Sequence, residues 1–405
     1  MRIKYIYLTK LIMKLSRKIS IPFGIFIIIV FIMVAVIQHE NFSDHKSMIQ
    51  LVLKTKNTKA SIDDFKFFEN VKIEKSSSPK KWAKHKLYNK LESTKELDSI
   101  HNEFDSTAFL IIKNDSIIHE KYFLGYDESS MTNSFSMAKS IISFLLFKSI
   151  ESNTVESLDE KLIKYYPEFE FRGGKDVTVG DLASMSSGLK WEENYKDLLG
   201  ITARAYVTKD LKKLMLKSSF IDLPGKKFNY QSGSTQLLAM VIEKANNKKI
   251  NDLVSEWLWD PIGAEEDALW MIDSKQNNET KAYCCLNSNA RDFSKVGKLY
   301  KNMGQINGKQ VIDSSNVIKS ISPRFENNPI YGYGFWLGEY ENHKFFSLRG
   351  HQGQYVIVFP RIDLIITRLG RSKAKGQSLN GFPKDFEKYI SESFKILKTN
   401  KLISE

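Results

Sequence analysis

Cysteine is scarce in this chain, and its placement argues against two common roles. The 405 residues include two cysteines, Cys284 and Cys285, which are adjacent in the sequence. Neighbouring cysteines rarely bridge each other because their Cα atoms lie closer than an ordinary disulfide requires. No Cys-x-x-Cys or Cys/His spacing suggests a metal site. We therefore predict a buried pair of thiols that does not report the redox compartment, and we expect no metal or organic cofactor.

A basic stripe interleaved with aromatic residues is also missing, although the formal net charge is +13. Lysines are instead scattered among asparagine, isoleucine and serine, without a nucleic-acid-binding motif. A dense basic group stands at the very beginning of the chain, where it suits a membrane surface better than a nucleic acid. Its members are Arg2, Lys4, Lys10, Lys14, Arg17 and Lys18. We expect no nucleic-acid partner.

One uncharged apolar run, residues 19–38, reaches the length that a membrane helix needs. About 20 residues of helix span the roughly 30 Å hydrocarbon core of a bilayer. The positive-inside rule makes residues 1–18 a cytoplasmic tail and puts the rest of the chain on the periplasmic side of the cytoplasmic (inner) membrane. A cleaved signal peptide is the alternative. Because no small-x-small cleavage site follows, we favour an uncleaved single-pass anchor.

The remainder divides into a polar segment, residues 39–95, and a folded domain, residues 96–398. We interpret the first as a juxtamembrane spacer. In the second, two β-rich runs flank Asn114-Asp115, which predicts a hairpin. Helical patterns follow to about residue 260, and strands and a terminal amphipathic helix return in the last part. We predict an α+β fold: an antiparallel sheet built from both ends of the chain, flanked by helices, with a helical domain inserted.

A Gly-x-Ser-x-Gly elbow is absent, which disfavours an α/β-hydrolase. Ser-x-x-Lys occurs several times, but Ser136 and Lys139 alone open a nearly wholly apolar helix, 136–151. Three residues of spacing place the amine one helical turn from the hydroxyl. Burial favours the neutral amine, which can activate a serine nucleophile. The alternative is a capping serine followed by a lysine whose amine reaches solvent.

Two later stretches favour the reactive interpretation. Tyr230 and Ser232 stand in a turn before another apolar helix, and a phenol near a lysine can take part in proton transfer. His351 and Gly353 precede a long strand pair, where glycine would let a substrate approach the strand. The backbone N–H of Gln354 could donate to an oxyanion. A catalytic cleft is expected where the helical part meets the sheet edge.

The three stretches together resemble a known family. Ser-Met-Ala-Lys at 136–139, Tyr-Gln-Ser at 230–232 and His-Gln-Gly at 351–353 are similar to the ordered motifs of the serine β-lactamase and penicillin-binding-protein-like hydrolases. Order and spacing resemble the class C β-lactamase branch, in its 6-aminohexanoate-dimer-hydrolase and esterase-like group. The likeness runs from about residue 105 to 375. It implies a β-lactamase/transpeptidase-like fold and a serine hydrolase.

The resemblance also implies roles for the motif residues. Ser136 would accept the acyl group. Lys139 would adjust the reactivity of the serine hydroxyl and transfer its proton. Tyr230 would act as general base and then protonate the leaving group. The backbone N–H groups of Ser136 and Gln354 would form the oxyanion hole. Ser232 occupies the place where many relatives have an asparagine that touches the lysine and the substrate.

Two departures from the family pattern bear on the substrate. His351 stands where β-lactamases and transpeptidases usually carry lysine, and histidine is only partly charged near neutral pH. Ser232 cannot supply the side-chain amide of the usual asparagine. Both favour an esterase, amidase or peptidase acting on a small-molecule or peptide ester or amide. A β-lactamase or D,D-carboxypeptidase is the first alternative, and a non-catalytic homologue that binds peptidoglycan or a partner is the second.

Overall fold

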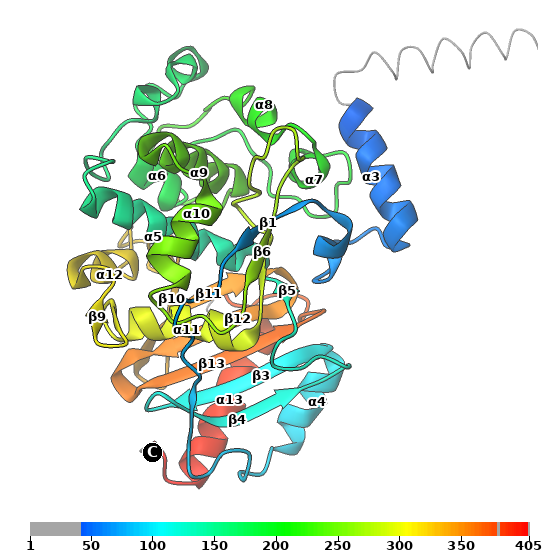
Figure 1. The fold of residues 1–405 in the computed structure, drawn as a ribbon, viewed down its shortest axis with the longest axis vertical. Coiled ribbons are helices and arrows are strands. Elements are labelled where there is room, and N and C mark those ends of the chain that lie inside the picture. Colours follow the sequence, from blue (N-terminus) through cyan, green and yellow to red (C-terminus); the bar gives the residue numbers. More distant parts are fainter. Residues whose placement is uncertain (1–41, 379–380, 404–405) are drawn as a thin grey trace, which may run out of the picture.

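The computed structural model describes residues 42–378 and 381–403 and has the predicted α+β architecture. A seven-stranded sheet lies beside a mainly helical region, with a smaller four-stranded sheet near their junction (Figure 1). In spatial order the large sheet is β10 (Trp336–Tyr340), β11 (His343–Gly350), β12 (Gln354–Phe359), β13 (Leu364–Gly370), β3 (Ser106–Lys113), β4 (Ser116–Tyr122) and β2 (Ala83–Lys84). Neighbouring strands are antiparallel except β2 and β4.

Both ends of the domain meet in this sheet, as predicted. The early hairpin β3–β4 pairs with the late strand β13, where Ile365 lies opposite Ile112. Asn114 and Asp115 form its turn with φ of 49° and 56°. Positive φ at both turn residues gives a backbone twist that matches the flanking strands, and Asn and Asp tolerate it. The hairpin prediction is confirmed.

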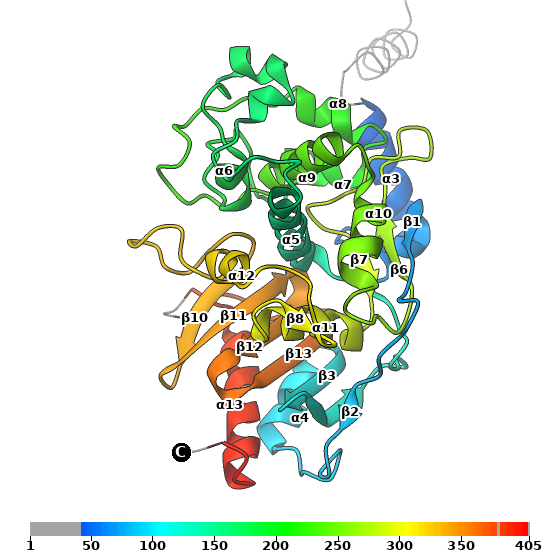
Figure 2. The same cartoon turned by 60° about the vertical axis from the view of Figure 1, so that its left-hand side comes forward.

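Helices cover both faces of the large sheet and fill the inserted region. They are α3 (Phe42–Thr55), α4 (Lys95–Glu103), α5 (Ala138–Glu151), α6 (Val179–Ala183), α7 (Ile201–Val207), α8 (Leu211–Leu216), α9 (Ser232–Asn246), α10 (Ile250–Val254), α11 (Ala290–Lys301), α12 (Ser314–Ser320) and α13 (Lys384–Thr399). Helices α4 and α13 lie together on one face, and α11 packs against β12 and β13 on the other (Figure 2).

Two hydrophobic cores follow from this layering. The larger joins α5 and α9 of the inserted region to one face of the sheet, and the smaller lies between the opposite face, α4 and α13. Helix α5 contributes Ile141, Phe144 and Leu145, all fully buried. Because α5 is enclosed along its length, the residues at its beginning are held rigidly at the junction of helices and sheet.

We expected residues 39–95 to be a spacer. The described part of this segment, from residue 42 on, instead contributes strands to both main sheets. Strand β1 (Asn70–Ile73) pairs with β6 (Ala268–Met271), and β2 joins the large sheet. The small sheet continues from β6 through β7 (Leu286–Ser288) to β5 (Thr132–Asn133). A further two-stranded sheet consists of β8 (Gln305–Ile306) and β9 (Lys309–Gln310). Strand β5 leads directly toward Ser136 and fixes the approach of the chain to that residue.

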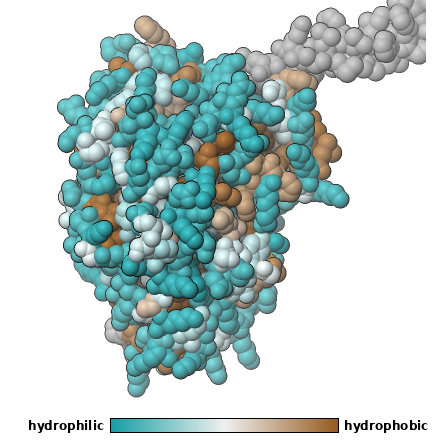
Figure 3. Space-filling model, in the orientation of Figure 1, coloured by the Kyte–Doolittle hydropathy of each residue, from teal (hydrophilic) through white to brown (hydrophobic). Residues whose placement is uncertain are grey.

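The prediction of a single-pass protein in the cytoplasmic membrane is corrected by the structure. Within residues 42–378 and 381–403, no helix is both long enough and apolar enough to cross a bilayer. Helix α3, for example, has 14 residues and spans about 21 Å, and it includes charged residues. It does expose Ile49 and Leu53, and apolar side chains are visible over α3 in Figure 3. The segments on which the prediction depended, residues 1–18 and 19–38, lie outside the described residues.

Two histidines of the smaller core give the fold a predictable acid sensitivity. His101 and His119 are buried, and burial lowers their pKa to about 3 and about 4. Both nitrogens of His119 lack a hydrogen-bond partner among the described residues. In the unfolded chain these rings titrate near pH 6.5, so the stabilisation is complete above that pH and is lost as the pH falls toward 4.

We therefore expect the free energy of unfolding to fall by about 2 kcal/mol per histidine between pH 7.5 and 5. Urea titrations at the two pH values measure it. Burial raises the pKa of Glu279 to about 7, so protonation of this carboxylate stabilises the fold on acidification and offsets part of the loss from the histidines. The wild type is therefore compared with His119→Leu, in which the contribution of Glu279 is unchanged. That variant should lose less stability than the wild type on acidification. An equal loss in both proteins would contradict the prediction.

Candidate active site

Ser136 lies in a short 3-10 turn, η2 (Phe135–Met137), which passes into α5. Its neighbours on both sides are buried, whereas Ser136 itself is partly exposed. Phe135 has a φ of 44°, an unfavourable value for a bulky residue, and its N–H donates to Asn133 Oδ1 at 2.8 Å. Strain of this kind persists where the surroundings impose it. The hydroxyl is thereby presented at the surface of an otherwise closed core.

Lys139 is the residue that joins the predicted motifs. Its Nζ donates to Ser136 Oγ at 3.0 Å, to Ser232 Oγ at 3.1 Å and to the carbonyl oxygen of Tyr283 at 2.7 Å. The side chain is 3% exposed. Burial lowers its pKa to about 8, although the charge of Glu193 acts in the opposite direction. About a tenth of the amine is then neutral at pH 7, far more than for an ordinary lysine, and can accept a proton from the serine.

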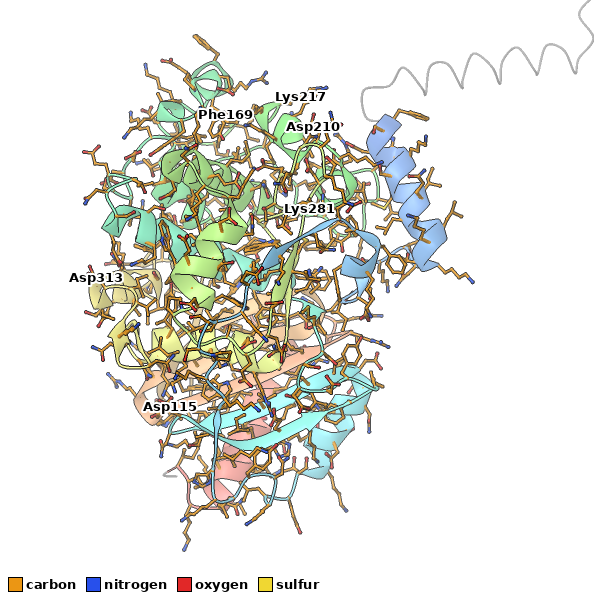
Figure 4. The ribbon with its side chains drawn as sticks, in the orientation of Figure 1. Asp115, Phe169, Asp210, Lys217, Lys281 and Asp313 are labelled. Atoms are coloured by element: carbon orange, nitrogen blue, oxygen red, sulfur yellow. A yellow bond between two sulfur atoms is a disulfide. The ribbon has the colours of Figure 1, made fainter. Side chains whose placement is uncertain are left out.

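A second buried lysine shows that burial alone does not make such a site. Lys281, labelled in Figure 4, is fully buried, and burial also lowers its pKa to about 8. Its amine donates to the backbone carbonyls of Ala205 and Thr208, at 3.2 and 3.3 Å. Both acceptors are backbone carbonyls, which cannot serve as nucleophiles. The distinguishing feature of Lys139 is therefore its contact with a serine hydroxyl.

Tyr230 and Ser232 come to the same place from the beginning of α9. The Tyr230 ring centroid lies 5.1 Å from Lys139 Nζ. Burial and the charge of Glu193 raise the pKa of Tyr230, while a side-chain hydrogen bond with Ser136 lowers it. The net shift is upward, so the phenol keeps its proton at neutral pH. Of the two groups beside Ser136, Lys139 is therefore the better proton acceptor and Tyr230 the better donor.

Glu193 is a site residue that the sequence analysis missed. Its Oε1 accepts from Ser232 Oγ at 2.7 Å and from Tyr195 OH at 2.6 Å. Its Oε2 accepts from the Ser232 N–H at 2.7 Å and from Trp191 Nε1 at 3.0 Å. A chain of hydrogen bonds thus runs from Ser136 through Lys139 and Ser232 to this carboxylate. The available signal was an acid between two aromatic residues, "WEENY", in a polar loop.

His351 and Gly353 form a turn, η6 (His351–Gly353), beside the nucleophile. The His351 ring stacks on Tyr195, with centroids 4.9 Å apart, and lies edge-on to Phe135 at 5.6 Å. Burial, with the charges of Lys373 and Lys59, lowers the pKa of His351 to about 4. The imidazole is consequently neutral at physiological pH and supplies no positive charge to a substrate.

Gly353 and Gln354 are held from behind by Arg368. Gly353 has a φ of 82°, and a Cβ there would lie 1.9 Å from Arg368 Nη1. The same nitrogen donates to the carbonyl of Gly353 at 3.0 Å. Gln354 is buried, and its side-chain amide donates to Gly370 O at 2.6 Å and to His351 O at 3.1 Å. Arg368 and Gln354 together fix the turn that carries His351.

The two cysteines lie close to this site but differ from the expected state. Cys284 and Cys285 are buried, as predicted, yet the structure joins them through a disulfide rather than leaving free thiols. They follow Tyr283, whose carbonyl accepts from Lys139, and the Trp270 indole donates to Cys284 O at 2.7 Å. Cys285 adopts a positive φ of 73°, which local spacing did not suggest. Among the described residues no group of His, Cys, Asp and Glu side chains is arranged to hold a metal.

Comparison with known proteins agrees with this geometry. A 6-aminohexanoate-dimer hydrolase from Paenarthrobacter ureafaciens is 21% identical over 297 residues, covering 68% of this chain and 74% of the relative. A solved structure from Bacillus anthracis, named as a candidate 6-aminohexanoate-dimer hydrolase, has a TM-score of 0.68 at 21% identity. The match covers 85% of this chain and 94% of that one. D-amino acid amidase from Ochrobactrum anthropi has a TM-score of 0.58 at 15% identity, with coverages of 76% and 97%.

The two structural likenesses bear on the fold, and the predicted β-lactamase/transpeptidase-like fold is confirmed. The wider assignment depends on the family pattern named Beta-lactamase, which matches residues 96–379. That match takes in well over half of the chain and contains Ser136, Tyr230 and His351 together with the strands and helices that hold them. The protein thus belongs to the Beta-lactamase family and is a serine hydrolase of that family.

Proposed function

We propose that the protein hydrolyses an ester or an amide through a covalent acyl-enzyme on Ser136. The observation that carries the proposal is the contact of Lys139 Nζ with Ser136 Oγ at 3.0 Å, made by a buried amine whose pKa is lowered to about 8. An adjacent base of this kind is what a serine hydroxyl needs to become a nucleophile near neutral pH.

Acylation follows from the contacts at the site. Ser136 Oγ attacks the substrate carbonyl carbon while its proton passes to the neutral amine of Lys139. The backbone N–H groups of Ser136 and Gln354 are proposed to receive the developing oxyanion. When the tetrahedral adduct collapses, the bond from carbon to the leaving alcohol or amine breaks. The protonated phenol of Tyr230 donates to that leaving group and is reprotonated from Lys139.

Deacylation reverses these roles with water in place of the leaving group. Water loses a proton toward Tyr230 and Lys139, attacks the ester on Ser136, and the serine recovers its proton as the acid departs. Glu193 holds Ser232 by two hydrogen bonds, and its charge acts on Lys139, which is positively charged in each tetrahedral intermediate. Ser232 is therefore assigned a relay and positioning role rather than that of an amide clamp.

The neutral imidazole of His351 bears on the choice of substrate. The family's usual lysine at this position would carry a charge, whereas a ring with a pKa of about 4 does not. This supports an esterase, amidase or peptidase over a β-lactamase or D,D-carboxypeptidase. The non-catalytic alternative is disfavoured because Ser136, Lys139 and Tyr230 are all present and in contact.

Two active-site probes test the proposal. The chain, from residue 42 on or in full, is treated with a fluorophosphonate and with a fluorescent penicillin, in parallel with Ser136→Ala. Labelling of the wild type by the fluorophosphonate alone would support the proposed chemistry, and labelling by both would favour the penicillin-binding alternative. If the folded wild type takes up neither probe, or if Ser136→Ala is labelled equally, the proposal is wrong.

The pH dependence of turnover should report Lys139. Since only the neutral amine accepts the serine proton, we expect kcat/KM to rise with pH through an inflection near 8. The charge of Glu193 raises that pKa, so Glu193→Gln should move the inflection to lower pH. Initial rates on a p-nitrophenyl ester between pH 5 and 10 measure both. An inflection that Glu193→Gln leaves in place would contradict the assignment.

A further inference from the structure

Arg349 is a cation beside the site for which neither the fold nor the mechanism accounts. It lies on β11, two residues before His351, and its cross-strand partner is Tyr355. The guanidinium carbon is 3.5 Å from the centroid of the Trp336 ring, and the Phe382 ring lies 5.5 Å away. The side chain as a whole is partly exposed. The guanidinium thus lies flat on an indole, in a residue that is partly exposed.

The guanidinium has donors that nothing in the described part of the chain satisfies. Its Nη1 is buried without a hydrogen-bond partner, and no carboxylate of those residues forms an ion pair with Arg349. A ring face beneath the guanidinium attracts its charge but does not accept its in-plane N–H groups. Burial lowers the pKa of Arg349, which reflects the cost of keeping the charge there. Buried charges are ordinarily paired, so this one lacks its counterpart.

The nearby carboxylates already serve other donors. Asp385 accepts from Tyr355 OH and from the Ala374 N–H, both at 3.0 Å. Glu193 is held by Ser232, Tyr195 and Trp191, as described above. Lys373 also lies close enough to Arg349 for their charges to interact, and it adds to the positive potential. The local balance therefore favours an incoming anion.

Tyr230 connects this cation to the reacting groups. Its ring lies 5.3 Å from the Trp336 ring and 5.1 Å from Lys139 Nζ. Both Ser136 and the charge of Arg349 act on its phenol and lower its pKa. An anion held by Arg349 would accordingly belong to a molecule whose carbonyl is at Ser136.

From this geometry we propose that Arg349, lying on Trp336, binds a carboxylate of the substrate and makes the enzyme selective for acidic esters or amides. A planar guanidinium matches a carboxylate with two parallel N–H···O bonds. This proposal rests on the hydrolase function proposed above and narrows its substrate class. The carboxylate belongs either to the acyl part or to the leaving group, and the test separates the two.

The test compares matched pairs of esters that differ in a carboxylate. Mono-p-nitrophenyl adipate and p-nitrophenyl hexanoate vary the acyl part, while meta-acetoxybenzoate and its methyl ester vary the leaving group. We expect the wild type to prefer the acidic member of one pair by at least about tenfold in kcat/KM, mainly through KM. Arg349→Met should bring that ratio close to one, and Arg349→Lys should restore part of it. Arg324→Met, which alters an arginine beside Phe325 elsewhere, should keep the wild-type ratio.

Each outcome bears on one of the two proposals. Ser136-dependent hydrolysis without a charge preference, or a preference that survives Arg349→Met, would overturn the carboxylate site and leave the hydrolase intact. If no ester is turned over and Ser136 takes no probe, both proposals fail. Should Arg349→Met not fold, the wild type decides: hexanoate should inhibit hydrolysis of the neutral ester competitively and hexanamide should not. Equal inhibition by the two would contradict the proposal.

Discussion

Replacement of Lys139 by methionine is expected to lower kcat/KM at pH 8 by at least about a thousandfold, with loss of labelling at Ser136. The reason is specific to the contacts. Methionine keeps the length and burial of the side chain but removes the group that lies 3.0 Å from Ser136 Oγ. Without it the serine proton has no acceptor, because the raised pKa of Tyr230 keeps that phenol protonated. Steady-state kinetics on a p-nitrophenyl ester measure the effect.

Lys281→Met is the matched control for this experiment. Lys281 is equally buried and has the same lowered pKa of about 8, but its amine contacts the carbonyls of Ala205 and Thr208. Its replacement should change stability, measured by urea unfolding, and leave kcat/KM of the folded fraction near the wild-type value. A similar kinetic loss in both variants would indicate a general effect of removing a buried charge and would contradict the role of Lys139.

Tyr230→Phe is expected to lower kcat by about a hundredfold to ten-thousandfold with a much smaller change in KM. The phenol is close enough to Ser136 for that side chain to lower its pKa, and it is assigned to protonate the leaving group, an interaction that matters most in the transition state. The loss should be larger for an amide than for a p-nitrophenyl ester, since nitrophenolate departs without a proton. Initial rates measured on an amide and on a p-nitrophenyl ester, for the wild type and for Tyr230→Phe, give the two losses in kcat.

The stability of Tyr230→Phe should change little, because the ring keeps its contacts with Trp336 and Tyr331. Tyr166→Phe serves as control: it removes a buried hydroxyl that donates to Met240 O at 3.2 Å and lies outside the site. Both variants are expected to unfold within about 1 kcal/mol of the wild type. Normal activity in Tyr230→Phe, or an unfolded protein, would contradict the proposed role.

The fold could be predicted largely because its signals are local or ordered along the chain. Asn114-Asp115 between two β-rich runs is a hairpin signal that needs no tertiary information. The order of an early hairpin, then helices, then late strands is compatible with few sheet topologies. In the structure the early and late strands join where β3 pairs with β13. What local pattern could not give is the pairing of the polar segment before residue 95, because β1 and β2 are short and take their partners from distant strands.

The site was predictable to the extent that its chemistry requires particular residue types. Ser136 and Lys139 shared their spacing with other pairs, and Tyr230 and His351 were singled out by the chemistry that such a pair needs. Glu193 was missed because a carboxylate that holds a serine and a tyrosine leaves no spacing rule in the sequence. The disulfide of the adjacent cysteines was likewise unexpected, because neighbouring cysteines rarely bridge and the positive φ of Cys285 has no signal in the sequence.

The lowered pKa of Lys139 was predicted from its apolar helix, but the pKa shifts of two other site residues lay beyond the sequence. A tyrosine near a lysine suggested a general base. Burial and the charge of Glu193 raise the pKa of Tyr230, and for that reason we propose it as the proton donor. A histidine in the third motif suggested a partly charged group, but its surroundings hold it neutral above a pH of about 4. Each shift depends on burial and on side chains far away in the chain.

The central claim is that the acyl group of the substrate is transferred to Ser136, and trapping that intermediate tests it most directly. Wild-type protein is mixed with excess p-nitrophenyl ester, quenched in acid within the first turnovers, and analysed by intact mass and peptide mapping. We predict a mass gain of one acyl group replacing one hydrogen on the peptide that contains Ser136, and no such gain in Ser136→Ala. Turnover without any adduct, or an adduct on another residue that persists in Ser136→Ala, would contradict the claim.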